Sequence, residues 1–312
     1  MASLWRARQF HNQPEESHQH PFLVDLWQAV REQTAGRFDC RVYAHNAGVP
    51  GSDPAVLKML LEGDVELFTQ MGGILGQIAP VMEIQGLPFA FTSSEQVYRA
   101  MDGELGALLG KELAAKGLYC FPRGLMENGF RHISTIDRPI STADDLVGVK
   151  LRIPGGRIFA DLFESLGAAP VVVTIAELYD ALKTRRVEGQ ENPLVVTEVN
   201  RLYEVTRYVA ITNHMWSGFN MLANLRFWST LPADVQTIIE LNVATHVARQ
   251  REYTRRLNRA LESRLVQRGL VFTTGDAGGF RRRLGDGFYR RWKAELGTTA
   301  WRLLEAEVGS LT

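Results

Sequence analysis

Hydrophobic and polar positions follow two different periods over the first 70 residues. Leu4 to Phe10, Phe38 to Tyr43 and Val65 to Gln70 alternate as β-strands do. Between them, Phe22 to Gln33 and Pro54 to Glu62 carry apolar residues at helical spacing and are followed closely by a glycine. This order of strands and helices predicts a parallel sheet with helices on its faces, which is an α/β fold.

A second unit of the same kind begins near residue 130. Strand-like segments occur at Phe130 to Ile133, Val149 to Ile153 and Val171 to Val173, and we expect the last of these to be buried. Ile158 to Leu166 and Ala176 to Arg185 have helical spacing. Sheets of this class bind ligands at the carboxyl ends of their strands, so we look for a site there.

The last third of the chain predicts one long helix. Thr230 can cap it, Pro232 can occupy its first turn, and neither Gly nor Pro occurs from Ala233 to Arg268. An unbroken helix of this length measures roughly 50 Å, which exceeds the width of a small domain. We therefore expect it to cross between two lobes, and the absence of a linker predicts that the chain passes between them more than once.

Composition narrows the class of protein. The chain has 312 residues, 35 basic and 35 acidic, and is 45 % hydrophobic, as expected for about two globular domains. Its zero net charge argues against a nucleic-acid partner. The first residues lack a basic start followed by an apolar stretch. This predicts either a cytosolic protein or one whose export signal has been removed.

Catalytic and cofactor chemistry is not indicated. The sequence lacks GxGxxG after the first strand, a GxxxxGK[ST] loop, HExxH and GxSxG. Cys40 and Cys120 have neither disulfide-framework nor metal-ligand spacing, and we interpret both as small core residues. His18 and His20 lack an accompanying carboxylate or cysteine cluster. We therefore expect no enzymatic activity, no cofactor and no metal.

Arg152 is the charged residue that points most clearly to a ligand. It lies between Leu151 and Ile153 in a short apolar strand, where a guanidinium is costly unless an anion pairs with it. Its planar fork fits a carboxylate in a bidentate manner. Taken alone, the position leaves two partners open: an internal Asp or Glu, which is the commoner case, or a ligand.

Further segments stand in a particular order and spacing around this arginine. They are Asn12–Ser17, Gly148–Pro154, Glu177–Thr184, Glu188–Pro193, Tyr203–Val205 and Thr212–His214. Taken together they resemble the substrate-binding proteins of tripartite ATP-independent periplasmic (TRAP) transporters, the DctP-like family. The resemblance covers the chain from about residue 5 to about residue 300.

That resemblance implies a two-lobed, hinged α/β fold like that of periplasmic binding proteins. Lobe I would comprise residues 1–129 and 217–257, and lobe II residues 130–216 and 258–312, with a ligand cleft between them and the long helix as a bridge. Such a protein captures a small organic acid and delivers it to membrane permease subunits. It also implies a periplasmic location, and we expect a monomer.

The resemblance also assigns roles to individual residues. Arg152 matches the family's carboxylate clamp, and Arg131 matches a position that commonly adds a second charged contact. Asn192 matches an amide that forms a hydrogen bond with the ligand. Asn12 lies in the first strand-to-helix turn, which lines the cleft from the other lobe.

Four apolar residues bear on the kind of acid. Met71 and Ile74 occupy positions where polyol-binding relatives often have a carboxylate or an arginine, and Ile175 stands where relatives often place an aromatic ring. Trp216 falls on a segment that reaches into the cleft in relatives. An apolar pocket disfavours polyols, because their hydroxyl groups lose water without gaining partners. We therefore expect an aromatic or apolar-tailed 2-oxo or 2-hydroxy monocarboxylate, such as benzoylformate or mandelate.

Several alternatives stay open. Met71 and Ile74 could be ordinary core residues, and Trp216 could pack between the lobes without touching ligand. The ligand could be a C4-dicarboxylate or a sugar acid (a uronate or aldonate), in which case Arg131 could clamp a second carboxylate. An α/β enzyme acting on an organic acid would need a base or metal that the sequence does not nominate, and a solute-sensing module would have the same cleft.

Overall fold

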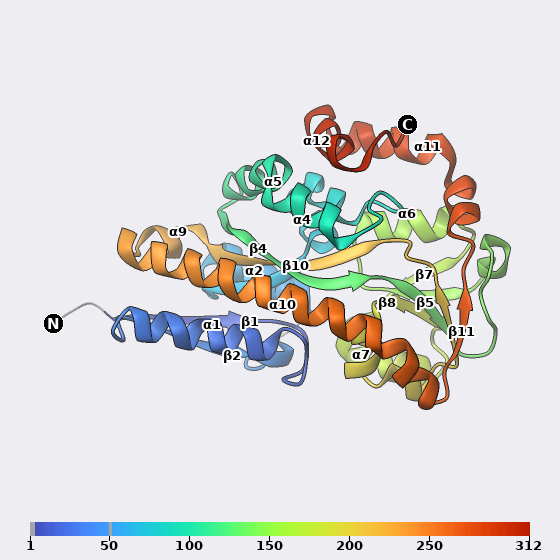
Figure 1. Cartoon of the computed structure of the whole chain (residues 1–312), viewed down its shortest axis with the longest axis horizontal. Coiled ribbons are helices and arrows are strands. Elements are labelled where there is room, and N and C mark those ends of the chain that lie inside the picture. Colours follow the sequence, from blue (N-terminus) through green and yellow to red (C-terminus); the bar gives the residue numbers. More distant parts are fainter. Residues whose placement is uncertain (1–3, 50–51) are drawn as a thin grey trace.

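The computed structural model describes residues 4–49 and 52–312, which form two α/β lobes, each built on its own sheet (Figure 1). Residues 1–3, on which part of the export-signal prediction rests, lie outside the described residues. No helix in the described part of the chain has the length and apolarity needed to cross a bilayer.

The sheet of lobe I has five strands in the order β2-β1-β3-β10-β4. Their bounds are β1 Trp5–Phe10, β2 Phe38–Tyr43, β3 Leu67–Met71, β4 Leu118–Phe130 and β10 Trp216–Asn224. β1 is parallel to β2 and β3, as the alternating pattern predicts, whereas β10 runs antiparallel to both β3 and β4. A strand from late in the sequence therefore completes the first lobe.

The sheet of lobe II has six strands in the order β11-β9-β5-β8-β6-β7. Their bounds are β5 His132–Thr135, β6 Lys150–Ile153, β7 Ala169–Val172, β8 Gly189–Asn192, β9 Tyr208–Ile211 and β11 Val271–Thr274. The prediction of a buried strand at Val171 to Val173 is wrong in part. β7 lies at the edge of the sheet and Val172 is 62 % exposed, because only one neighbouring strand covers it.

Helices cover both sheets. The α-helices are α1 His20–Gln33, α2 Asp53–Glu62, α3 Gly72–Leu75, α4 Ser94–Asp102, α5 Glu104–Ala114, α6 Arg157–Ser165, α7 Ile175–Lys183, α8 Leu194–Val199, α9 Leu225–Ser229, α10 Ala233–Gln267, α11 Ala277–Leu296 and α12 Thr298–Val308. Short 3₁₀ helices are η1 Ala44–Asn46, η2 Pro80–Gly86, η3 Ala143–Leu146 and η4 Leu202–Glu204.

α10 is the predicted bridging helix. Its 35 residues contact β4 and α1 of lobe I and also α8 and β11 of lobe II, and it runs along most of the molecule in Figure 1. The chain also crosses between the lobes from β4 to β5 and from β9 to β10. The two lobes are thus joined at several places, which is the arrangement of a hinge.

The expected boundary of lobe II needs a correction at the C-terminus. β11 joins the second sheet, but α12 packs on α4 and α5 of lobe I, and α11 contacts both η2 of lobe I and α6 of lobe II (Figure 1). Residues 277–308 therefore cover lobe I more than lobe II. Cys40 and Cys120 are free thiols that are only partly buried, so neither is a full core residue.

Candidate functional site

A cavity lies between the lobes at the carboxyl ends of β1, β3, β6 and β8. Its polar lining is Asn12, Gln13, Asp53, Asn128, Arg152, Thr174 and Asn192, and its apolar lining is Pro54, Met71, Pro154, Ile175, Val196 and Phe219. The cavity proper is about 40 Å³, within a recess of about 450 Å³ that includes its mouth. This is the place where α/β sheets bind ligands.

Arg152 lines this cavity, and the carboxylates of Glu191 and Asp53 act on its charge without a direct salt bridge. Its side chain is buried on β6, and Nε donates a hydrogen bond to the carbonyl oxygen of Val173 at 2.8 Å. Among residues 4–49 and 52–312, no carboxylate forms a salt bridge with Arg152 within 4.0 Å. Burial lowers the pKa of Arg152 to about 10, so the group remains charged at neutral pH.

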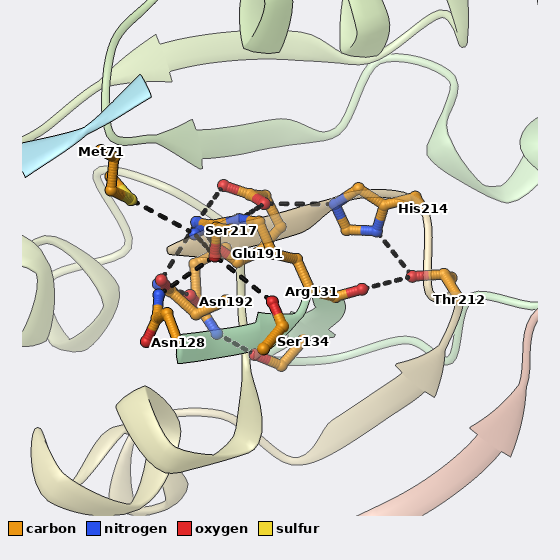
Figure 2. Close-up of polar contacts among 11 residues, drawn as sticks. Met71, Asn128, Arg131, Ser134, Glu191, Asn192, Thr212, His214 and Ser217 are labelled. Carbon is orange, nitrogen blue, oxygen red and sulfur yellow. Dashed lines mark hydrogen bonds and ion pairs between the residues drawn. The ribbon is translucent and has the colours of Figure 1, made fainter. Parts of the chain in front are cut away.

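Arg131 has a different environment from the one expected. It is fully buried and forms an ion pair with Glu191, whose Oε1 accepts from Nη2 at 2.7 Å and whose Oε2 accepts from Nε (Figure 2). Nη1 donates to Ser217 Oγ at 3.2 Å and lies 3.8 Å from the sulfur of Met71. These partners occupy the guanidinium. Arg131 therefore does not line the cavity, and its guanidinium is paired within the protein.

Glu191 connects this pair to a histidine. Its Oε2 accepts from His214 Nε2 at 3.1 Å, and His214 Nδ1 accepts from the Thr212 hydroxyl at 2.7 Å (Figure 2). Burial raises the pKa of Glu191, but Arg131 and His214 outweigh it and hold the pKa below its ordinary value. Burial lowers the pKa of His214. A neutral imidazole that donates through Nε2 satisfies both contacts.

The two predicted asparagines reach the cavity from opposite lobes. Asn192 accepts from Arg131 Nη2 at 3.0 Å and donates to Gln190 Oε1 at 2.6 Å. Asn12 donates to Asp53 Oδ2 at 2.5 Å. Each amide nitrogen carries a second hydrogen, so each can also donate to a ligand.

Of the four apolar residues expected to contact the ligand, two line the cavity and two lie in the core. Met71 and Ile175 line the cavity, whereas Ile74 is 2 % exposed and does not. Trp216 is also buried elsewhere, because its indole nitrogen donates to Glu127 Oε1 at 2.9 Å. Ile74 and Trp216 are therefore removed from the list of cavity residues. Phe219, on the same strand as Trp216, lines the cavity instead.

Asp53 is the main cavity residue that the sequence did not indicate. It begins α2, and its carboxylate accepts hydrogen bonds from Asn12 and, at 3.0 Å, from Asn46 Nδ2. Burial raises the pKa of Asp53. The signal in the sequence was an acidic residue directly before Pro54, which is typical of a helix start and gave no reason to expect a ligand contact. No group of three or more metal-ligating side chains occurs within the described ranges.

Comparison with known proteins decides the family. Residues 10–281 match the profile of the DctP family, described as bacterial extracellular solute-binding proteins, family 7. The chain belongs to this family. The expectations of a solute-binding protein without enzymatic function, and of a location outside the cytoplasm, agree with this membership.

Curated relatives of family 7 are similar over part of their length. The C4-dicarboxylate-binding periplasmic protein DctP of Rhodobacter capsulatus is 31 % identical over 216 residues, which cover 69 % of this chain and 63 % of that protein. Across three such relatives, the chain spans between 38 % and 63 % of their length.

Solved structures of the family match nearly the whole chain. A TRAP periplasmic solute-binding protein from Sulfitobacter sp. NAS-14.1 with bound β-D-galacturonate has a TM-score of 0.90 at 26 % identity, covering 97 % of this chain and 99 % of that one. The sugar acid binding protein DctPAm of Advenella mimigardefordensis in complex with galactonate has a TM-score of 0.91 at 25 % identity, covering 98 % and 99 %. The predicted two-lobed binding-protein fold is confirmed.

Proposed function

We propose that this protein is the periplasmic solute-binding component of a TRAP transporter, and that it captures a small hydroxylated carboxylate of the sugar-acid kind. It would act as a monomer and deliver the acid to membrane permease subunits. The observation that carries the proposal is Arg152, a buried guanidinium at a cavity between two lobes that forms no salt bridge with any carboxylate of the described residues. A buried cation of this kind is stabilised by an anion from outside the chain.

The carboxylate of the ligand would pair with the two terminal nitrogens of Arg152. Charge-assisted hydrogen bonds of this type contribute roughly 1.5–3 kcal/mol each. Asn192, on the neighbouring strand β8, would donate its remaining amide hydrogen to the same ligand. These two residues belong to lobe II and would fix the orientation of the acid.

Hydroxyl groups would find their partners in lobe I. Asp53 and Asn12 line the opposite wall, and a carboxylate beside an amide can accept from and donate to a polyol. Bound galacturonate and galactonate in the two solved relatives agree with this chemistry. A ligand that contacts both lobes favours the closed state by its greater affinity for that state.

The apolar-tailed 2-oxo acid is the second candidate. Met71, Ile175, Val196 and Phe219 line the cavity and could contact such a tail. Against it stands the burial of Trp216 and Ile74 away from the cavity, which removes two of the apolar contacts expected for such a tail.

A ligand screen tests the proposal. D-galacturonate, D-galactonate, succinate and benzoylformate are added singly at rising concentration while the melting temperature is followed, because a ligand stabilises by mass action. We expect the sugar acids to raise it, and calorimetry with Asp53→Asn to show roughly tenfold weaker binding of a sugar acid with succinate little changed. A shift with benzoylformate alone would favour the second candidate, and no shift with any acid would contradict the proposal.

A further inference from the structure

Glu83 makes a contact between the lobes that the ligand site does not explain. It lies on η2 of lobe I, its side chain is 1 % exposed, and Oε2 accepts a hydrogen bond from the backbone nitrogen of Ile158 at 2.6 Å. Ile158 lies in the first turn of α6 in lobe II. A carboxylate at this position satisfies an amide that has no partner within the helix and interacts favourably with the helix dipole.

The capped helix is continuous with the ligand site. α6 follows β6, the strand of Arg152, after the short turn Pro154–Gly156, and Pro154 lines the cavity. The two lobes are in close contact here. A Cβ added at Gly156 would lie 2.6 Å from the carbonyl oxygen of Gly73, and one added at Gly73 would lie 2.6 Å from the ring of Phe159. The Glu83 contact therefore requires the lobes to be close together.

We propose that Glu83 is a positioning residue that caps α6 only when the lobes close, so that it holds the turn after Arg152 in place and makes ligand affinity depend on pH. This inference rests on the proposed function, because it describes the regulation of the same cleft. Glu83 itself does not line the cavity and acts through α6.

The charges around Glu83 set the direction of the pH effect. Burial raises the pKa of Glu83 to about 7. The hydrogen bond from the Ile158 amide and the charge of Arg157 on α6 lower this pKa, whereas the charge of Glu295 on α11 raises it further. Arg157 and Glu295 pair with each other at 3.2 Å, which offsets their separate effects.

When the lobes separate and expose Glu83, its pKa returns toward the ordinary value of about 4.3. Between these two values the closed state binds the proton more tightly than the open state. Closure, and with it ligand affinity, is therefore favoured as pH falls from about 8 to about 5.5, on the order of tenfold for one such group.

The first experiment is done with saturating D-galactonate, which favours the closed state. The full chain is labelled with ¹⁵N-isoleucine, and the Ile158 amide resonance is followed as a function of pH. We expect it to titrate with a midpoint near 7 in the wild type and to stay constant in Glu83→Gln. Asp145→Asn is the matched control, because Asp145 also caps a helix start but does so within lobe II. An Ile158 resonance that ignores pH, or that titrates equally in Glu83→Gln, overturns the proposal.

The second experiment measures affinity for D-galactonate by calorimetry at about pH 8 and about pH 5.5. The wild type should bind roughly tenfold more tightly at the lower pH, and Glu83→Gln should differ less than about twofold between them. Gly76→Ala should weaken binding at both pH values, since its Cβ would lie 2.3 Å from Glu83 Cγ and displace the carboxylate.

Equal pH dependence in Glu83→Gln and wild type overturns the proposal. Failure of any acid to bind would count against the proposed function, whereas binding that is the same in Glu83→Gln and wild type at both pH values would count against the role of Glu83 alone.

Discussion

Arg131 and Glu191 form an ion pair in which both side chains are 0 % exposed. Glu191 directly precedes Asn192, so the pair fixes the end of β8 at the wall of the cavity. On the next strand, Arg152 is equally buried, but in the part of the chain that the structure describes no carboxylate forms a salt bridge with it. One arginine is therefore paired within the fold, and the other is the group that we propose binds the ligand.

Arg152→Lys should weaken binding of a sugar acid by tenfold or more. Lysine keeps the charge but lacks the planar fork and the Nε that donates to Val173, and each 1.4 kcal/mol is a factor of ten. Calorimetry measures the effect. Arg185→Lys is the control, because Arg185 forms an exposed ion pair with Asp137 and neither residue lines the cavity. Wild-type affinity in Arg152→Lys would show that the clamp is assigned to the wrong residue.

Glu191→Gln should lower the free energy of unfolding by about 3–5 kcal/mol, because it leaves the Arg131 charge buried without a counter-charge. The double variant Arg131→Met/Glu191→Leu should recover part of this loss, since neither charge is then buried. Urea unfolding of all variants gives the comparison. Glu204→Gln, which breaks the exposed pair with Arg201, should cost less than about 1 kcal/mol. A double variant no more stable than Glu191→Gln would contradict this account.

Trp216→Phe should destabilise the fold and leave ligand affinity within about twofold. The buried indole packs in the core and donates to Glu127, and the loss of that donor leaves a buried carboxylate short of a partner at a cost of roughly 1–3 kcal/mol. Ile175→Ala is the comparison, because Ile175 lines the cavity and is only half-buried. It should change affinity with little effect on unfolding. The reverse result would return Trp216 to the ligand site.

His18 should make the fold less stable in acid. Burial lowers the pKa of His18 to about 4, whereas an unfolded histidine titrates near 6.5. The unfolded chain therefore binds the proton more tightly, and stability is lost as pH falls from 6.5 toward 4, by roughly 3 kcal/mol for this group.

Urea unfolding of His18→Asn across that range should show a smaller loss than the wild type, and the exposed control His45→Asn should not. His11 and His132 also make the fold less stable as pH falls, because burial lowers their pKa values. Glu83 and Glu127 have the opposite effect on stability, because burial raises their pKa values to about 7. The difference between variant and wild type isolates His18. Parallel curves would contradict its contribution.

The sequence predicted the parts of the fold that have a local period. β1, α1, β2 and α2 fall within a few residues of the expected segments, because each pairs or packs with a neighbour close in sequence. β10 could not be found in this way. It is buried along its whole length and shows no alternation, and it reaches β3 from more than a hundred residues away.

The same distinction applies to the cavity residues. Arg152 was recognisable because a charge within an apolar strand requires an explanation. The ion pair of Arg131 could not be predicted, because its partner lies 60 residues away and meets it only through the pairing of β5 with β8. Trp216 was misplaced because the face on which a strand residue lies depends on register, which the local sequence of β10 does not define.

The order in which the strands join the two sheets limits where the chain can be cut into fragments that keep both sheets. A fragment ending at residue 215 would contain all of β3 and β4 but not β10, so the two strands would lose their shared neighbour. A fragment ending at residue 276 would keep both sheets and remove the helices that shield α4 and α5. Hybrids that exchange a whole lobe with a relative therefore need several junctions, and a single crossover would split a sheet.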